Sequence, residues 1–358
     1  MASKYSNTMT FLIIFLFVVM LLSILEPGKF LSATNIQQMG FQIPEFGLLA
    51  LAMMTAMLSG GIDLSIISIA NLSGIIAAIV LLTLSYHGSM DFNTLLQGIM
   101  AEKAMAVDIT QTAPTGIAML GIILISAAAA VGIAGLCGLL NGVLVAIFRI
   151  PPILATLGTM KLFEGISLVI TKGSPIKNFP KQFLFIGSGT ISHIPVPMII
   201  FVICILIYRF FLTRTRLGSR IYAVGENPIA SQFSGLNNKV IIIKTYLISG
   251  ILAGIAALLI MSRVDSVKVG YGSSYLLQAV LVVILGGVSY MGGIGNVFGV
   301  VLGILILRAI SSGFNIIGFS NHFRNVIWGS MLIMVTIANY IVPMISDRIR
   351  IRAKSEFK

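Results

Sequence analysis

The sequence predicts an all-α, polytopic membrane protein with about ten transmembrane helices. Of its 358 residues, 57% are hydrophobic and only 9% are charged, and the mean hydropathy is +1.04. A soluble globular domain is about a quarter charged, so this composition excludes an ordinary soluble chain. Apolar runs long enough to cross a bilayer follow one another along the sequence, and we therefore treat residues 1–358 as a single transmembrane domain.

A transmembrane helix needs about 20 mostly apolar residues. The candidate spans, in chain order, are 9–25, 41–58, 64–84, 117–148, 153–171, 195–212, 240–262, 276–290, 296–312 and 325–345. The run 117–148 is longer than one crossing needs, and 276–290 is shorter. The first run resembles the core of a signal peptide. A charged stretch at 26–29 separates it from any small-residue cleavage site, so we interpret it as a retained span.

The basic residues predict that both termini are cytoplasmic. In this orientation the basic loop 213–239 and the basic tail 346–358 lie inside, and the long polar loop 85–116 lies outside. The lysine-rich segment 172–181 is then also outside, against the usual charge bias.

Two stretches, Leu51–Ala77 and Leu277–Gly303, share a plan that indicates a weak internal repeat. In each, an apolar run reaches a glycine pair, Gly60-Gly61 or Gly286-Gly287, and a second apolar run follows. Paired glycines favour a break in a helix because their backbone is costly to order. Broken helices in corresponding halves indicate a transport pathway. The alternative is that the glycines only let helices pack closely, and the sequence leaves both interpretations open.

The residue pattern does not indicate an enzyme or a metal site. Three histidines, His87, His193 and His322, are scattered in predicted outer loops, and Cys137 and Cys204 lie in apolar runs. The sequence contains no Walker A motif, and no predicted span contains two carboxylates. We therefore expect a non-catalytic chain that binds no cofactor.

Few ionisable residues fall within the spans, whereas an ion-coupled carrier usually needs several. The candidates are Glu45, Asp63, Arg308, and the pair Lys161 and Glu164, which are spaced to neutralise each other. Asp63 follows the first glycine pair, and its carboxylate could either cap the next helix or line a pathway.

Neutral polar residues within the spans suit an uncharged, hydroxyl-rich cargo, because amides and hydroxyls form hydrogen bonds without burying a charge. For each residue the alternative is a hydrogen bond between helices. The candidate pathway residues are Ser59, Asp63, Asn71, Asn141, Thr159 and Gln278.

Residues 226–235 predict a short cytoplasmic helix. Asn227 suits the N-cap, Pro228 the first helical position and Gly235 the end. Ile229 and Phe233 lie four residues apart and form an apolar face. So short a helix is unstable alone in water, so it must dock either on its own bundle or on a partner. The predicted docking segment comprises Glu226, Asn227, Pro228, Ile229, Ala230, Gln232, Phe233 and Gly235.

Five motifs carry a resemblance to a known family. They are Leu58–Ser65, Gly138–Gly142, Arg149–Thr159, Gly218–Gly235 and Leu285–Gly299. On these motifs the chain resembles the ABC-importer permeases of the ribose and simple-sugar branch, which are related more distantly to branched-chain amino-acid permeases.

The resemblance implies a multi-pass permease of the bacterial inner membrane that forms the translocation path for a sugar or similar neutral solute. Its expected partners are a second permease copy or paralogue, two cytoplasmic ATPase subunits that bind ATP and Mg, a soluble substrate-binding protein and membrane lipid, with no nucleic acid. It also implies that the helix beginning after Asn227 is the coupling helix that receives ATPase motion. The alternative is a secondary carrier or facilitator for a small polar solute.

The sequence departs from the family pattern at two places. Members of the branch often carry acidic residues where this chain has Leu276 and Gln278, which favours a heterodimer over a homodimer. The long insert at 85–115 is unusual for the branch.

Overall fold

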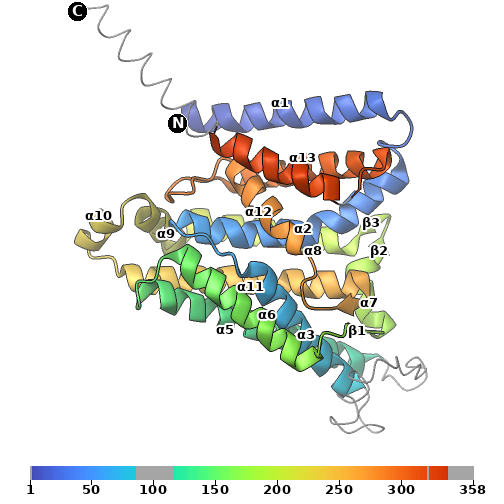
Figure 1. Ribbon diagram of the computed structural model, residues 1–358, viewed down its shortest axis with the longest axis horizontal. Helices are drawn as coiled ribbons and strands as arrows, with labels where there is room; N and C mark the ends of the chain where they lie inside the picture. The colour runs from blue at the N-terminus through green and yellow to red at the C-terminus, as the bar shows by residue number, and fades with distance from the viewer. Residues whose placement is uncertain (1, 86–115, 321, 338–358) are drawn as a thin grey trace, which may run out of the picture.

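A computed structural model describes residues 2–85, 116–320 and 322–337, with side chains from residue 12 onward. The described chain is almost entirely helical (Figure 1). The long helices are α1 (Ala2–Leu25), α2 (Ala33–Leu58), α3 (Ile66–Ser85), α5 (Ile117–Ala146), α6 (Pro152–Thr171), α8 (Val196–Arg214), α11 (Asn238–Val264) and α13 (Val297–Ile317). The shorter helices are α7 (Lys181–Ser188), α9 (Arg216–Glu226), α10 (Pro228–Phe233) and α12 (Ser273–Leu285).

The helices confirm a polytopic membrane protein. Within the described ranges, 7 helices are long and apolar enough to cross a membrane: α2, α3, α5, α6, α8, α11 and α13. Apolar helical segments also occur at Leu12–Leu25 and Ser273–Leu285. Each of the predicted spans therefore falls on a helix, although the last, 325–345, is described only to residue 337, within a helical stretch 322–337. The tail 346–358 and nearly all of the predicted loop 85–116 lie outside the described residues.

The predicted span 276–290 is wrong in length. Helix α12 has 13 residues and ends at Leu285, which corresponds to a length of about 20 Å. The hydrocarbon core of a bilayer is about 30 Å thick, so α12 is too short to cross it alone. The hydropathy of the sequence continues past residue 285, but the backbone turns at Gly286-Gly287 and ends the helix there.

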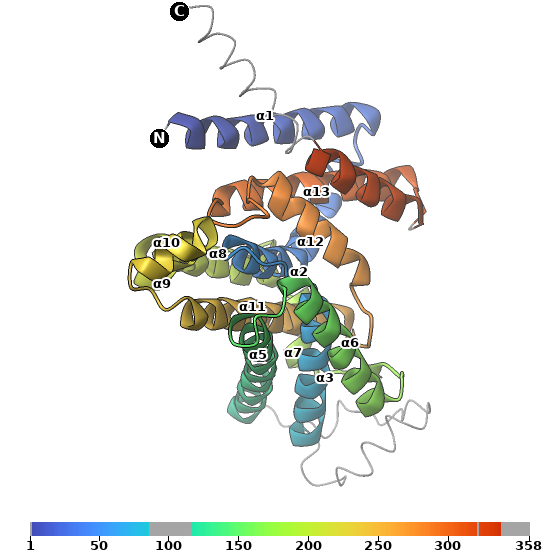
Figure 2. The same ribbon diagram turned by 60° about the vertical axis from the view of Figure 1, so that its left-hand side comes forward.

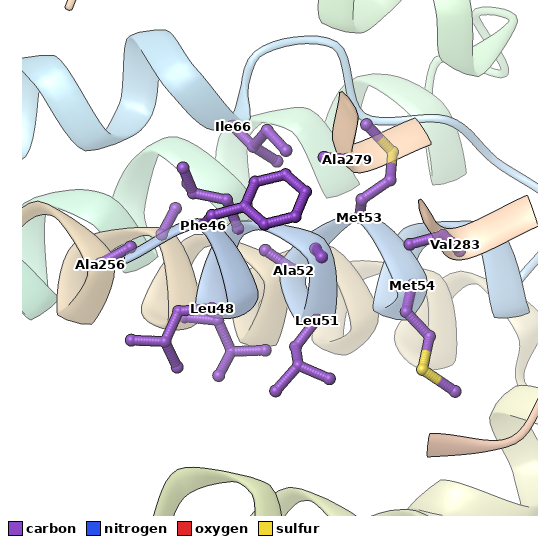
Figure 3. Close-up of a cluster of buried hydrophobic side chains, with 14 of the residues drawn as sticks. Phe46, Leu48, Leu51, Ala52, Met53, Met54, Ile66, Ala256, Ala279 and Val283 are labelled. Carbon is purple, nitrogen blue, oxygen red and sulfur yellow. The ribbon is translucent and has the colours of Figure 1, made fainter. Parts of the chain in front are cut away.

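Helix α2 forms the centre of the bundle. Its residues from Ile43 to Leu58 are buried on every side. Figure 3 shows Phe46 projecting from one side of this helix and Leu48, Leu51 and Met54 from the other. A helix that is apolar all round and buried all round must be enclosed by other helices.

Helices α5, α6 and α8 form part of the outer surface. Large apolar side chains such as Leu124, Leu154 and Ile207 are exposed on them. A soluble protein does not expose apolar surface of this extent, whereas a bilayer accommodates it. Lys161 and Glu164 on α6 form the predicted ion pair, with Nζ 2.8 Å from Oε2.

Glycines allow α5 and α11 to pack with their backbones in close contact. A Cβ atom built on Gly138 would lie 2.3 Å from the Tyr246 carbonyl oxygen, and one on Gly250 would lie 2.2 Å from that of Ala134. Real Cβ atoms do not approach other atoms more closely than 3.0 Å, so only glycine fits at these positions. Glycines at these positions therefore bring the backbones of the two helices together.

The two ends of the bundle carry different short elements (Figure 1). Helices α9 and α10 lie at one end, and α7 lies at the opposite end with the small strands. The strands form two antiparallel pairs: β1 (Ile176–Lys177) with β4 (Ser266–Val267), and β2 (Thr190–Ile191) with β3 (Ile194–Pro195). Helix α1 packs on α13 at the edge of the bundle, as both views show (Figures 1 and 2).

Candidate functional site at the two helix breaks

The two glycine pairs end their helices with the same hydrogen-bonded turn. At the first break, Gly60 N donates to Met57 O (3.0 Å) and Gly61 N donates to Ala56 O (3.2 Å). At the second, Gly287 N donates to Ile284 O (3.0 Å), and Val288 N donates to Val283 O (3.1 Å). This is the Schellman motif, which requires a left-handed residue after the cap.

Gly60 and Gly287 supply that residue, with φ of 85° and 81°. The matching turns confirm the predicted helix breaks and give the weak repeat a structural basis: α2, a break and α3 in one half, and α12, a break and α13 in the other. They do not distinguish a pathway from close packing.

Asp63 is the centre of a buried polar cluster just after the first break. Its Oδ1 accepts hydrogen bonds from Ser65 N (3.0 Å) and Ser65 Oγ (2.6 Å), and its Oδ2 accepts one from Ser249 Oγ (3.2 Å). Asn141 Nδ2 donates to Ser65 Oγ (2.7 Å) and lies 3.5 Å from Asp63 Oδ1. The carboxylate therefore joins the start of α3 to α5 and α11.

Two oxygen atoms of this region lack a hydrogen-bond partner among the described residues. They are Asn141 Oδ1 and Tyr246 Oη, and both side chains are fully buried. A Cβ atom built on Gly61 would lie 2.4 Å from Tyr246 Oη, so this phenol lies directly against the first break. A buried polar atom without a partner costs about 1–3 kcal/mol, so these two oxygen atoms stand out beside the hydrogen-bonded groups of the cluster.

The remaining candidate pathway residues occupy separate places. Ser59 Oγ donates to Ala56 O (2.9 Å) within the first turn, and Thr159 Oγ1 donates to Thr156 O (3.3 Å) on α6. Asn71 Nδ2 donates to Tyr271 O (3.2 Å), and Gln278 is buried on α12. Of the predicted set, the structure therefore brings only Asp63 and Asn141 into one cluster.

Helix α10 is short, capped and fixed to its neighbours. Asn227 Oδ1 accepts hydrogen bonds from Ile229 N (3.0 Å) and Ala230 N (2.9 Å), which confirms it as the N-cap. At the start of α11, Asn238 Nδ2 donates to Pro228 O (2.7 Å) and Asn238 Oδ1 accepts from Ser231 Oγ (2.9 Å). These bonds hold α10 between α9 and α11.

The apolar face of α10 points away from the rest of the chain. Ile229 is 69% exposed and Phe233 is 89% exposed. The predicted choice between docking on the bundle and docking on a partner is therefore resolved in part: neither side chain is covered by the described residues. Glu226, Gln232 and Gly235 are also exposed.

Several residues of these sites did not stand out in the sequence. Tyr246 and Ser249, both on α11, contact the first break. Ser249 bonds Asp63 although the two residues are 186 positions apart in the sequence. Glu45 is one of the predicted intramembrane charges, but its partner Arg263, 218 residues along the chain, is not among the predicted site residues. The sequence signal for Ser249 and Tyr246 is that they are polar residues on the glycine-rich face of α11, which packs on α5.

The chain matches a family model described as "Branched-chain amino acid transport system / permease component" over residues 35–336. The chain belongs to this permease family. The permease is 32% identical over 309 residues to the D-allose transport system permease protein of Escherichia coli K12, covering 86% of the chain and 84% of the relative. It is 32% identical over 321 residues to the ribose import permease protein of Bacillus subtilis 168, covering 89% and 88%.

The autoinducer 2 import system permease protein of Yersinia pseudotuberculosis YPIII is 28% identical to the permease over 301 residues, covering 82% of the chain and 80% of the relative. No solved structure matches the permease. The resemblance drawn from the five motifs is thus confirmed, and the permease is a multi-pass membrane transport protein.

Proposed function

We propose that this permease is the membrane subunit of an ATP-driven importer for a sugar or similar neutral polar solute. The relatives it matches are named as D-allose, ribose and autoinducer 2 permeases, and D-allose and ribose are sugars. The uncharged polar residues next to the first break, such as Asn141 and Ser249, suit such a cargo.

The observation that carries the proposal is the uncovered apolar face of α10. Ile229 and Phe233 are large apolar side chains exposed to 69% and 89% on a helix that its own cap and neighbours hold in place. Preordered apolar anchors of this kind favour binding in a groove, because little side-chain or backbone freedom is lost on docking. The partner we infer is the ATPase subunit, which makes α10 the coupling helix.

The charge of the α9–α10 end supports a cytoplasmic location. Arg214, Arg216, Arg220 and Lys239 are all exposed there. Basic residues concentrate on the cytoplasmic side of membrane proteins. In this orientation both chain termini are cytoplasmic, and the opposite end, with α7 and the strands, meets the soluble binding protein.

In the assembly we propose, the permease pairs with a second copy or paralogue and with two ATPase subunits, which bind ATP and Mg and carry out hydrolysis. The translocation path runs past the first break. There, Asn141 Oδ1 and Tyr246 Oη have no partner among the described residues, and cargo hydroxyls would supply one when the path opens. Ser59, Asn71, Thr159 and Gln278 extend this path.

The proposal is tested by making the α10 face polar. The double variant Ile229→Asp and Phe233→Asp should lose about 2 kcal/mol or more of binding free energy for the co-expressed ATPase subunits. The measurements are co-purification and binding-protein-dependent uptake of radiolabelled D-ribose and D-allose. The matched control, Ile229→Leu with Phe233→Leu, keeps the face apolar and should retain association. ATPase association that is unchanged in the aspartate variant would contradict the assignment.

A further inference from the structure

Three backbone segments meet near the end of α9 with no side chain between them. Gly293 N, in the loop between α12 and α13, donates to Leu58 O at the end of α2 (3.0 Å). Gly225, on the last turn of α9, packs on this bond. A Cβ atom built on Gly225 would lie 2.0 Å from Leu58 O and 2.5 Å from Gly293 N. Only glycine fits, because real Cβ atoms do not approach within 3.0 Å.

The neighbouring glycines are constrained by the same contact. A Cβ atom on Gly292 would lie 2.7 Å from Gly60 N and 2.8 Å from Gly225 O, and one on Gly293 would lie 2.5 Å from the Cα atom of Glu226. Gly292 and Gly293 also have φ of 95° and 73°, where a side chain is strained. We name Leu58–Gly60, Gly225 and Gly292–Gly293 the glycine junction.

The glycine junction is linked to α10 through a short, hydrogen-bonded path. Asn227, which caps α10, donates its own N–H to Ala223 O on α9 (3.1 Å). Tyr222 Oη donates to Gly295 O (3.1 Å), just beyond the junction. A phenol keeps its proton at neutral pH, and burial raises the pKa of the Tyr222 phenol further, so this group is a hydrogen-bond donor. A displacement of α10 therefore has few flexible groups to absorb it before it reaches Gly225.

Helix α11 gives α10 a second connection, but to the first break alone: Tyr246 lies against Gly61, and Ser249 bonds Asp63. The glycine junction differs because it touches both halves of the repeat. Gly60 belongs to the turn of the first break, and Gly292-Gly293 follow the turn of the second.

We propose that the glycine junction transmits movement of α10 to both helix breaks at once, which makes Gly225 a positioning residue for transport. The proposal rests on the proposed function, in which α10 docks on the ATPase. Close-packed backbone atoms cannot move independently, since they have no rotamers that can adjust between them. A shift of α9 must then displace the end of α2 and the α12–α13 loop together.

The test compares Gly225→Ala with Gly158→Ala, a helical glycine with nothing within 4 Å of its added Cβ. Each variant is assembled with co-expressed ATPase subunits in lipid nanodiscs, and hydrogen exchange is measured without nucleotide and after trapping with ATP and vanadate. In the unmodified complex and in Gly158→Ala, trapping should change the exchange of peptides 58–66 and 287–296. In Gly225→Ala that change should be lost in both peptides, while ATPase association and ATP hydrolysis stay within about twofold.

A trapping response that persists in both peptides of Gly225→Ala overturns the proposal, as does the absence of any response in the unmodified complex. If Gly225→Ala fails to assemble, Tyr222→Phe replaces it, because this variant removes only the hydrogen bond to Gly295 O. It should weaken the response of peptide 287–296, and an unaltered response overturns the proposal. Failure of the proposed function is seen separately, as ATPase association that survives the aspartate variant of α10.

Discussion

The Arg263 guanidinium donates two hydrogen bonds to the Glu45 carboxylate, from Nη2 to Oε1 (2.8 Å) and from Nε to Oε2 (3.0 Å). Glu45 is only 1% exposed and also accepts a hydrogen bond from Tyr275 Oη (2.8 Å). The pair joins α2 to the last turn of α11, and Tyr275 adds the start of α12. Arg263 lies in the last turn of α11, whereas α10 precedes the first residue of α11, Asn238, so the pair is nearly the whole length of α11 away from the proposed coupling helix.

Breaking this pair should destabilise the permease. Arg263→Gln leaves the Glu45 charge buried without its partner, which should cost about 3–5 kcal/mol of the free energy of unfolding. The matched control is Lys29→Gln, because the Lys29–Glu26 pair lies in the turn between α1 and α2, has side chains exposed to 68% and 28%, and should contribute less than about 1 kcal/mol. Thermal unfolding of the detergent-solubilised variants measures the difference. Equal stability of the two variants would show that the buried pair does not hold the helices together.

The glycine contacts between α5 and α11 predict opposite effects for two alanine variants on one helix. Gly138→Ala places a Cβ 2.3 Å from the Tyr246 carbonyl oxygen, so the helices must separate, at a cost of about 1–3 kcal/mol. Gly132→Ala meets nothing within 4 Å and should stabilise α5 by about 0.5–1 kcal/mol. Thermal unfolding again provides the measurement, and destabilisation by Gly132→Ala would contradict the packing argument.

Asp63 serves as a hydrogen-bond centre, and we expect its geometry to matter more than its charge. Asp63→Asn keeps an oxygen to accept from Ser65 N and Ser65 Oγ, and Ser249 Oγ can reorient to accept from the new amide. Stability and uptake should therefore remain near those of the unmodified permease. Asp63→Leu leaves Ser65 N without this acceptor, so the free energy of unfolding should fall by about 1–3 kcal/mol. A stable Asp63→Asn variant that no longer transports would instead assign the negative charge to the transport step.

The features that the sequence predicted well depend on local signals. A glycine pair after an apolar run ends a helix in a Schellman turn, and both turns occur where the pairs lie. The order Asn227-Pro228 places an N-cap and a first helical residue side by side, and α10 begins there. The mistake at 276–290 has the same origin, because hydropathy counts apolar residues across a turn that the backbone makes.

The features that the sequence did not reveal depend on distant partners. Glu45 and Arg263 are 218 residues apart, and no local pattern links a carboxylate within α2 to an arginine near the end of α11. The glycine junction joins Leu58–Gly60, Gly225 and Gly292–Gly293, and in the sequence each of its glycines looks like an ordinary loop or helix-end glycine. Only the packing of the whole bundle brings these residues together.

The source of energy separates the proposed importer from a secondary carrier, and the distribution of buried charge favours the importer. Among the described residues, Glu45 is paired with Arg263, and buried Arg308 donates a hydrogen bond to the Gln42 carbonyl oxygen. Asp63 is held by hydroxyl and amide groups, so none of the three is arranged as a step in an ion relay. Membrane vesicles that contain the permease with its ATPase and binding-protein partners should take up D-ribose or D-allose when ATP is supplied inside the vesicle. An imposed proton or sodium gradient without ATP should drive no accumulation. The matched control is the aspartate variant of α10, which should fail under both conditions. Accumulation driven by the gradient alone, and equal in that variant, would assign the permease to the carriers.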